Sequence, residues 1–138
     1  MPGYFHEHAA PLDLSGQGNV PNKGFRAGQA GSLYAVLAHI SVHDDPATVC
    51  LPTGYGKTSV VMALPFLLKP QRVLIVEPSD ALRKQVASHF RELSTLRRIG
   101  ALPEEVPNPR VLRHEGRPVS AEDWGTLAEH DIVVSTPG

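Results

Sequence analysis

The segment from Leu51 to Thr58, LPTGYGKT, carries the residue types that bind a chain of phosphates. Gly54 and Gly56 permit a backbone with positive φ that points successive N–H groups into one hollow, and a following helix N-terminus adds partial positive charge. Lys57 would reach the terminal phosphates as a point charge, and the Thr58 hydroxyl would bind the magnesium that bridges them. The sequence therefore predicts a phosphate-binding loop, with Lys57 and Thr58 as catalytic residues and Thr58 as the metal ligand.

This loop departs from the strict pattern, which begins with glycine where Leu51 stands. Tyr55 is also bulky for the tip of such a loop, and the sequence offers no reason for it. The alternative interpretation is a glycine-rich turn between a strand and a helix, with Lys57 simply in solvent. The elements on either side decide between the two.

Those elements have the order that a phosphate loop requires. A short β-prone run, residues 48–51, precedes the loop, and an apolar helix is expected over residues 57–68, with Pro65 shortening its regular part. Before them, apolar residues at helical spacing predict a helix over residues 29–42. Cys50, just ahead of the loop, is expected to be an inert buried thiol.

The middle of the chain predicts a strand and then a helix. Residues 72–77 form an apolar run typical of a strand covered on both faces, and Ser79 is a suitable N-cap for the next helix. That helix is expected to bury Leu82, Val86, Phe90 and Leu93. It is expected to keep Arg83, Lys84 and Arg91 outside.

The last third repeats the alternation. A loop over residues 100–110 is followed by a short strand at 111–113, a helix over 121–129 opened by Ser120 and Asp123, and a buried strand at 131–135. Regular alternation of strand and helix predicts an α/β fold with a parallel sheet and crossover helices. Residues 1–24, which carry three prolines and no apolar periodicity, are expected to be a flexible arm.

Composition excludes several classes. The chain has 138 residues, of which 41% are hydrophobic and 20% charged, so collagen, coiled coil and low-complexity disorder are excluded. Its longest apolar run, nine residues at 60–68, is far short of the roughly 20 needed to cross a bilayer, and no secretory signal is visible, so we expect a cytoplasmic protein. A single cysteine and seven histidines without cysteine partners suggest neither a disulfide framework nor a structural metal. The net charge is −1, but residues 80–117 hold eight basic and five acidic groups, a weak indication of an anionic partner.

Three further segments, taken with the loop, resemble one family. FRAGQ at 25–29 looks like an aromatic-R-x-x-Q element, VLIVEPSDALRKQ at 73–85 looks like motif Ia, and DIVVSTPG at 131–138 resembles motif Ib. In this order they resemble the N-terminal part of the first RecA-like domain, a P-loop NTPase fold, of superfamily-two helicases of the DEAD/DEAH-like group, which includes type III restriction subunits. The resemblance covers residues 25–138. Each segment alone has a structural alternative: Phe25 as a core residue at a helix entry, Gln29 as a polar residue at a helix start, and TPG as a common turn.

The resemblance implies ATP and Mg²⁺ as cofactors and a nucleic acid as partner. By resemblance Gln29 reads the adenine edge, for which its amide has a donor and an acceptor. The implied cofactor-binding residues are Phe25, Arg26, Gln29, Pro52, Thr53, Gly54, Tyr55, Gly56, Lys57, Thr58 and Ser59. The implied contacts with a strand backbone are Pro78, Ser79, Arg83, Lys84, Ser135, Thr136 and Pro137. Asp80 stands where RNA-type members have arginine, which favours DNA over RNA and a restriction-type or repair-type branch.

Hydrolysis in this family needs a D-E-x-[DH] strand, an arginine finger and a second RecA-like domain, which this sequence does not contain. We therefore expect an incomplete domain that binds a nucleotide without turning it over and that needs the remainder of the helicase core. Without those strands, residues 49–51 would lose a ladder partner and expose an edge. Two alternatives stay open: another P-loop enzyme such as a kinase, and a non-catalytic module that binds nucleotide or nucleic acid.

Overall fold

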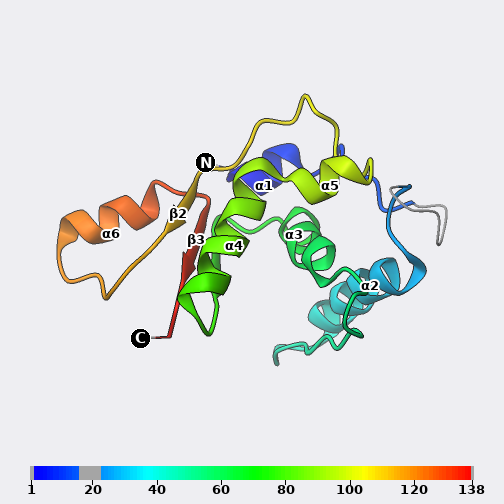
Figure 1. Cartoon of the computed structure of the whole chain (residues 1–138), viewed down its shortest axis with the longest axis horizontal. Helices are drawn as coiled ribbons and strands as arrows, with labels where there is room; N and C mark the ends of the chain where they lie inside the picture. The colour runs from blue at the N-terminus through cyan, green and yellow to red at the C-terminus, as the bar shows by residue number, and fades with distance from the viewer. Residues whose placement is uncertain (1, 16–22, 138) are drawn as a thin grey trace.

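The computed structural model describes residues 2–15 and 23–137. The chain forms six helices and three strands in this part (Figure 1). The elements, in chain order, are α1 (Tyr4–His8), α2 (Ala27–Val42), α3 (Lys57–Leu68), β1 (Val73–Val76), α4 (Asp80–Glu92), α5 (Ser94–Arg98), β2 (Val111–Arg113), α6 (Ala121–Ala128) and β3 (Ile132–Ser135). The predicted α/β class is confirmed, and most predicted elements lie within two residues of their observed bounds.

The three strands form one parallel sheet in the order β1-β3-β2. Ile132 of β3 pairs with Val73 of β1 on one side and with Val111 of β2 on the other. Because the strands are parallel, the helices that follow β1 and β2 return the chain to the end of the sheet at which the next strand begins. Helix α4 packs against β2 and β3, and α6 lies on the other side of these strands in Figure 1.

The core lies where α1, α3, α4 and α5 meet the inner face of the sheet. Its largest fully buried side chains are aromatic or long aliphatic: Phe5, Phe25, Phe66, Phe90, Leu33, Met62, Leu93, Leu96, Ile132 and Val134. Burying a side chain of this size stabilises a fold by about 1.5–3 kcal/mol. Apolar contacts along its length therefore hold helix α3 in place. The loop that directly precedes α3 is positioned by the same contacts.

The N-terminal segment differs from the expected arm. Tyr4 and Phe5, on α1, are buried, and their rings pack edge-on against Phe66 of α3 at centroid distances of 6.0 and 5.1 Å. The reason is that a five-residue helix carrying two large aromatic rings can close the core although it shows no periodicity. Residues 16–22, also in the expected arm, lie outside the described residues.

The segment before the phosphate loop is not a strand, which corrects the expectation for residues 48–51. These residues have no regular structure, and Cys50 is exposed, not buried. A strand needs a neighbour to pair with, and the described strands pair only among themselves.

The expectation that residues 72–77 form a strand covered on both faces is also wrong, because only one face of β1 is covered. Val73 and Ile75 pack against the core, whereas Leu74 is 68% exposed and Val76 is 53% exposed. Buried and exposed side chains alternate along β1, as they do in a strand that has packing partners on one face only.

Candidate phosphate-binding site

The loop from Pro52 to Gly56 turns the chain directly into α3. Gly54 and Gly56 have φ angles of 79° and 86°, the left-handed region that glycine occupies without a steric penalty. The Tyr55 N–H donates to the Pro52 carbonyl at 3.1 Å, which closes the turn, and Gly56 is the N-cap of α3. The glycine spacing therefore produces the backbone that the sequence predicted.

Four amide groups around this turn are open. In the described part of the chain, the N–H groups of Gly54, Gly56, Lys57 and Thr58 donate to no protein acceptor, while the next amide, that of Ser59, donates to the Gly56 carbonyl at 3.2 Å. These groups stand at the N-terminus of a twelve-residue helix, whose dipole favours negative charge. The arrangement suits a multiply charged anion such as a polyphosphate.

A cavity adjoins the loop. It has a volume of about 340 Å³ and is lined by Lys57 and Thr58 from the start of α3, by Glu77 after β1, and by the inner side of α4. Ligand pockets begin at about 300 Å³, so the space is large enough for part of a nucleotide, and apolar side chains of α3 and α4 form half of its lining. Lys57 is exposed and lines this cavity, as the phosphate-loop hypothesis requires.

Gln29, in the first turn of α2, is bound to the loop itself. Its Nε2 donates to the carbonyls of Tyr55 at 3.1 Å and Gly56 at 2.9 Å, and its Oε1 accepts the Arg26 N–H at 2.8 Å. The side chain is 5% exposed. The structure therefore brings Gln29 to the predicted site, but it places the amide against the protein backbone.

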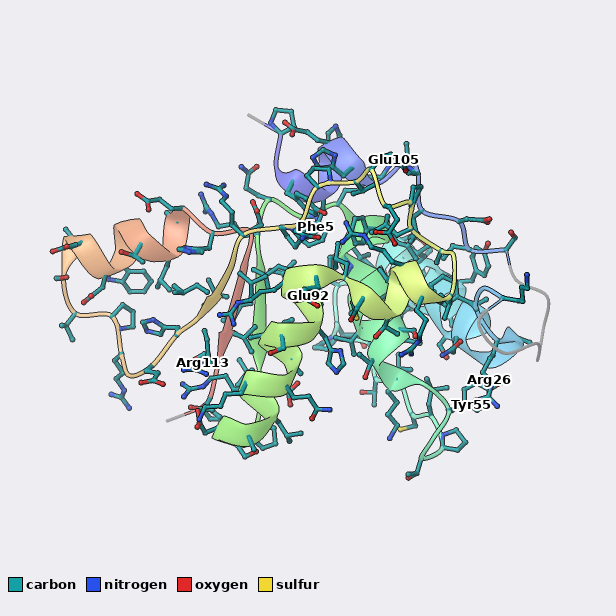
Figure 2. All side chains as sticks on the ribbon, turned by 45° about the horizontal axis from the view of Figure 1, so that its top comes forward. Phe5, Arg26, Tyr55, Glu92, Glu105 and Arg113 are labelled. Atoms are coloured by element: carbon teal, nitrogen blue, oxygen red, sulfur yellow. The ribbon has the colours of Figure 1, made fainter. Side chains whose placement is uncertain are left out.

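Tyr55 has a role that the sequence did not reveal. Its hydroxyl oxygen accepts the Gly28 N–H at 3.1 Å, and the Arg26 guanidinium lies over its ring, 4.4 Å from the centroid (Figure 2). Nη1 of Arg26 also donates to the Gly54 carbonyl at 3.3 Å. Tyr55 thus ties the tip of the loop to the start of α2. A bulky side chain between two glycines was the available signal.

The other residues implied as cofactor-binding fall into two groups. Pro52 and Thr53 are exposed on the outer part of the loop, whereas Ser59 is buried in the first turn of α3. Phe25 is 2% exposed and belongs to the core cluster. Its ring therefore lies in the core, which agrees with the helix-entry alternative.

The residues implied as nucleic-acid contacts gather at the carboxyl edge of the sheet. Val76 of β1 is in register with Ser135 of β3, and the Glu77 N–H donates to the Ser135 carbonyl at 2.9 Å. Pro78 and Ser79 follow directly on one strand, and residues 136–137 on the other. Two segments more than fifty residues apart in the sequence therefore end side by side.

Ser79 and Lys84 support the start of α4. The Ser79 hydroxyl accepts the Leu82 N–H at 3.3 Å, as predicted for an N-cap, and Lys84 pairs with Asp80 at 2.9 Å. Hydrogen bonds from Lys84, and next from Arg83, hold the pKa of Asp80 below its usual value. Asp80 is therefore negatively charged and lies close to the residues implied as nucleic-acid contacts.

Arg83 corrects the expectation that it stays outside. It is 6% exposed, and it donates to the His114 carbonyl at 2.6 Å, to Glu115 at 3.1 Å and to Asp80. Its guanidinium joins α4 to the turn after β2, because a long side chain can lay its stem along the sheet while its charge finds partners there. Leu82, expected in the buried stripe, is 40% exposed on the cavity side.

Among the residues the structure covers, no group of three or more histidine, cysteine or acidic side chains could hold a metal ion. No helix in the same residues has both the length and the apolar character to cross a membrane.

The sequence model of one protein family, described as DEAD/DEAH box helicase, matches residues 28–138. This stretch includes the phosphate loop, Gln29 and both segments at the carboxyl edge of the sheet, and it begins after Phe25 and Arg26. Neither a curated protein nor a solved structure matches the chain significantly.

Proposed function

Because this chain belongs to the DEAD/DEAH box helicase family, we propose that it is the ATP-binding part of a nucleic-acid-dependent helicase or translocase. The observation that carries the proposal is the loop at 54–58, which has four open amides at the start of α3 and whose Lys57 and Thr58 line a cavity of about 340 Å³. A family assignment alone gives only the class. The geometry of the loop supports a separate role for each of its residues.

Each residue has a separate task in this proposal. The open amides bind the bridging and terminal phosphate oxygens, and Lys57 adds a full positive charge beside them. The Thr58 hydroxyl holds Mg²⁺, which would neutralise negative charge on the phosphates when bound. Gly54 and Gly56 keep the backbone in the conformation that turns the amides inward.

We further propose that the carboxyl edge of the sheet contacts the sugar-phosphate backbone of a single strand. Ser79 at the start of α4, and Ser135, Thr136 and Pro137 after β3, stand next to one another there. Hydroxyl groups and helix N-termini commonly contact phosphates and carry no base preference. Asp80 stands where RNA-type members have arginine, and this difference favours a DNA substrate and a restriction-type or repair-type branch.

Binding without turnover is the expected state of this chain on its own. Hydrolysis needs a carboxylate for the metal and a second one to position and deprotonate water. Within the described residues, Glu77 is the single acidic side chain that lines the cavity with Thr58. The remainder of a helicase core would have to supply the other.

The test is nucleotide binding by the 138-residue chain, measured by titration calorimetry with Mg-ATP. Lys57→Ala should weaken binding at least about tenfold, which corresponds to one lost charge-assisted contact. Lys69→Ala removes the same charge at the other end of α3 and should leave the affinity unchanged. Equal affinities of all three proteins would contradict the assignment.

A second experiment separates the alternatives. In a protein that joins this chain to the remainder of a helicase core, Lys57→Ala should abolish ATP hydrolysis stimulated by DNA. Turnover that ignores nucleic acid would favour a kinase-like P-loop enzyme. Binding of single strands that needs no nucleotide and weakens steeply with salt would favour a non-catalytic module.

A further inference from the structure

Another cavity lies at the amino end of the sheet, opposite the end at which Glu77 lines the cavity beside the phosphate loop. It has a volume of about 450 Å³ and is lined by α1, by the residues before α1, and by the residues that lead into each of the three strands. This volume lies within the range of small-molecule pockets, which is about 300–1,000 Å³. One wall, residues 2–7, precedes residue 28, where the match to the helicase family begins.

Two arginines stand on either side of an aspartate in this cavity. Arg72 directly precedes β1, Arg110 directly precedes β2, and Asp131 directly precedes β3. The first residues of β1 and β2 are both in register with the first residue of β3, so the three side chains start at the same level of the sheet. With strands about 4.8 Å apart, the two arginine backbones are about 10 Å apart. Two side chains of this length can reach a small group between them.

The cavity has an excess of hydrogen-bond donors. Asp131 is engaged by Arg110, whose backbone N–H donates to its carboxylate at 2.7 Å and whose guanidinium pairs with it at 3.4 Å. Arg72 donates through Nε to the Ala128 carbonyl at 3.0 Å, and within the described residues its two terminal nitrogens have no acceptor or acidic partner. The amide nitrogen of Asn108 also has no acceptor there, because only its oxygen is engaged. Arg72 is therefore the uncompensated positive charge of the cavity.

Glu7, on α1, is the second acidic side chain of the lining. Its carboxylate is 4.0 Å from Nε2 of His8 and is paired with neither arginine. His130, the other titratable group near the arginines, donates through Nδ1 to the Thr126 carbonyl at 2.7 Å. Glu7 therefore lowers the positive potential of the cavity without occupying its donors.

The wall formed by residues 2–7 is fixed by contacts of its own. A Cβ atom at Gly3 would lie 2.7 Å from the carbonyl oxygen of Gln71 and 3.1 Å from its Cα, so only glycine lets this segment pack on the residue before Arg72. The Tyr4 hydroxyl donates to the Pro107 carbonyl, and Phe5 is fully buried in the core. A preformed pocket avoids part of the cost of ordering its walls when a ligand binds.

We propose that this cavity binds a small molecule through an oxyanion group, a carboxylate or a phosphate, which the Arg72 guanidinium holds with help from Arg110 and the Asn108 amide. The planar fork of an arginine presents two parallel N–H groups, which match the two oxygens of such a group. The site lies away from the phosphate loop and does not rest on the proposed function. A bound anion would also join residues 2–7 to the sheet and stabilise the folded chain.

The test is a titration of the 138-residue chain, followed by amide chemical shifts in nuclear magnetic resonance spectra. The probes are succinate and, separately, inorganic phosphate. Either should cause saturable shifts at residues 3–7, 71–72 and 110, with a dissociation constant of about 1 mM or tighter for the preferred probe. The tighter probe identifies the oxyanion as carboxylate or phosphate. Shifts confined to residues 54–58, or no saturable shifts, would overturn the proposal.

Three variants test the charges and the wall. Arg72→Met should weaken binding of the preferred probe at least about tenfold, because it removes the charge-assisted contacts. Glu7→Gln should tighten binding about two- to threefold, because it removes a repelling charge. Gly3→Ala changes no charge and should weaken binding, because the added methyl group displaces the wall from Gln71. Arg91→Met is the matched control, since it removes the same charge from an exposed position on α4 and should leave the affinity unchanged.

Circular dichroism should show equal helix content in all variants. Equal affinities of Arg72→Met and Arg91→Met would overturn the proposal. If Arg72→Met unfolds the chain because α6 loses its bond to Arg72, Glu7→Gln decides, and unchanged or weaker binding by that variant would overturn it. Lys57→Ala should keep the shifts at residues 3–7, so a loss of nucleotide binding at the phosphate loop and a failure of this site remain distinguishable.

Discussion

Arg83 of α4 donates a hydrogen bond of 3.1 Å to the carboxylate of Glu115, which lies thirty-two residues further along the chain. The ion pair joins the start of α4, and therefore the Ser79 cap, to the turn after β2. Its arginine side chain is buried and its glutamate side chain is exposed. The surface proposed to contact a nucleic-acid strand is therefore positioned by the guanidinium of Arg83, which is itself buried.

Arg83→Met should destabilise the chain by about 1–3 kcal/mol, because it keeps the stem but leaves Asp80, Glu115 and the His114 carbonyl without their donor. Urea denaturation followed by circular dichroism measures the change. Lys84→Met is the control, since Lys84 shares Asp80 but is mostly exposed, and its midpoint should hardly move. Equal losses in the two variants would mean that burial of Arg83 contributes nothing.

Gly56→Ala should destabilise the chain by about 1–2 kcal/mol and weaken nucleotide binding, because the residue has a φ of 86° and faces the Gln29 amide. Thermal unfolding and calorimetry give the two quantities. Gly31→Ala should instead leave binding unchanged and raise stability by up to about 1 kcal/mol, since it lies in a helix with open space around it. A tolerated alanine at Gly56 would argue against the observed loop conformation.

The stability of the chain should fall at alkaline pH because of Tyr4. Burial raises the pKa of Tyr4 from 10.0 to about 12, and its hydroxyl donates to the Pro107 carbonyl. The unfolded chain releases this proton first, so the contribution is complete below about pH 10 and is lost as the pH rises to about 12. Tyr4→Phe should be less stable at neutral pH by about 1 kcal/mol and should show a flatter profile over that range. Tyr34→Phe should keep the steep profile of the parent.

Cys50 should react in the folded chain. It is exposed, and it is the one cysteine of the sequence, so a thiol reagent should label one group per chain under native conditions. The rate should be within about tenfold of the rate in denaturant, because no structure has to open first. If labelling required denaturant, Cys50 would be buried, as the sequence suggested.

The parts of the fold that were predictable depend on local signals. Helix α3 begins at Lys57 and ends at Leu68 as expected, because glycines mark its start and the apolar run marks its length. The capping box of Ser120 and Asp123 and the parallel alternation of strands were readable for the same reason. The loop conformation also followed from the spacing of two glycines.

The parts that were not predictable depend on partners distant in the sequence. Arg83 looks like a solvent-facing residue until the turn after β2 arrives beside it, and Phe5 looks like part of an arm until it meets Phe66. Residues 48–51 have the composition of a strand, but a strand also needs a neighbouring strand to pair with, which composition does not reveal. The same holds for Tyr55, whose task depends on Gly28 on another helix.

The strand order has a consequence for how the chain acquires its shape. β3 is central in the sheet but comes last of the described strands in the sequence, and both β1 and β2 pair with it alone. During synthesis the two earlier strands must wait until residues 132–135 emerge before either can pair. Sheet closure therefore comes late and joins remote segments, which slows folding and leaves the earlier apolar strands open to misassociation in the meantime.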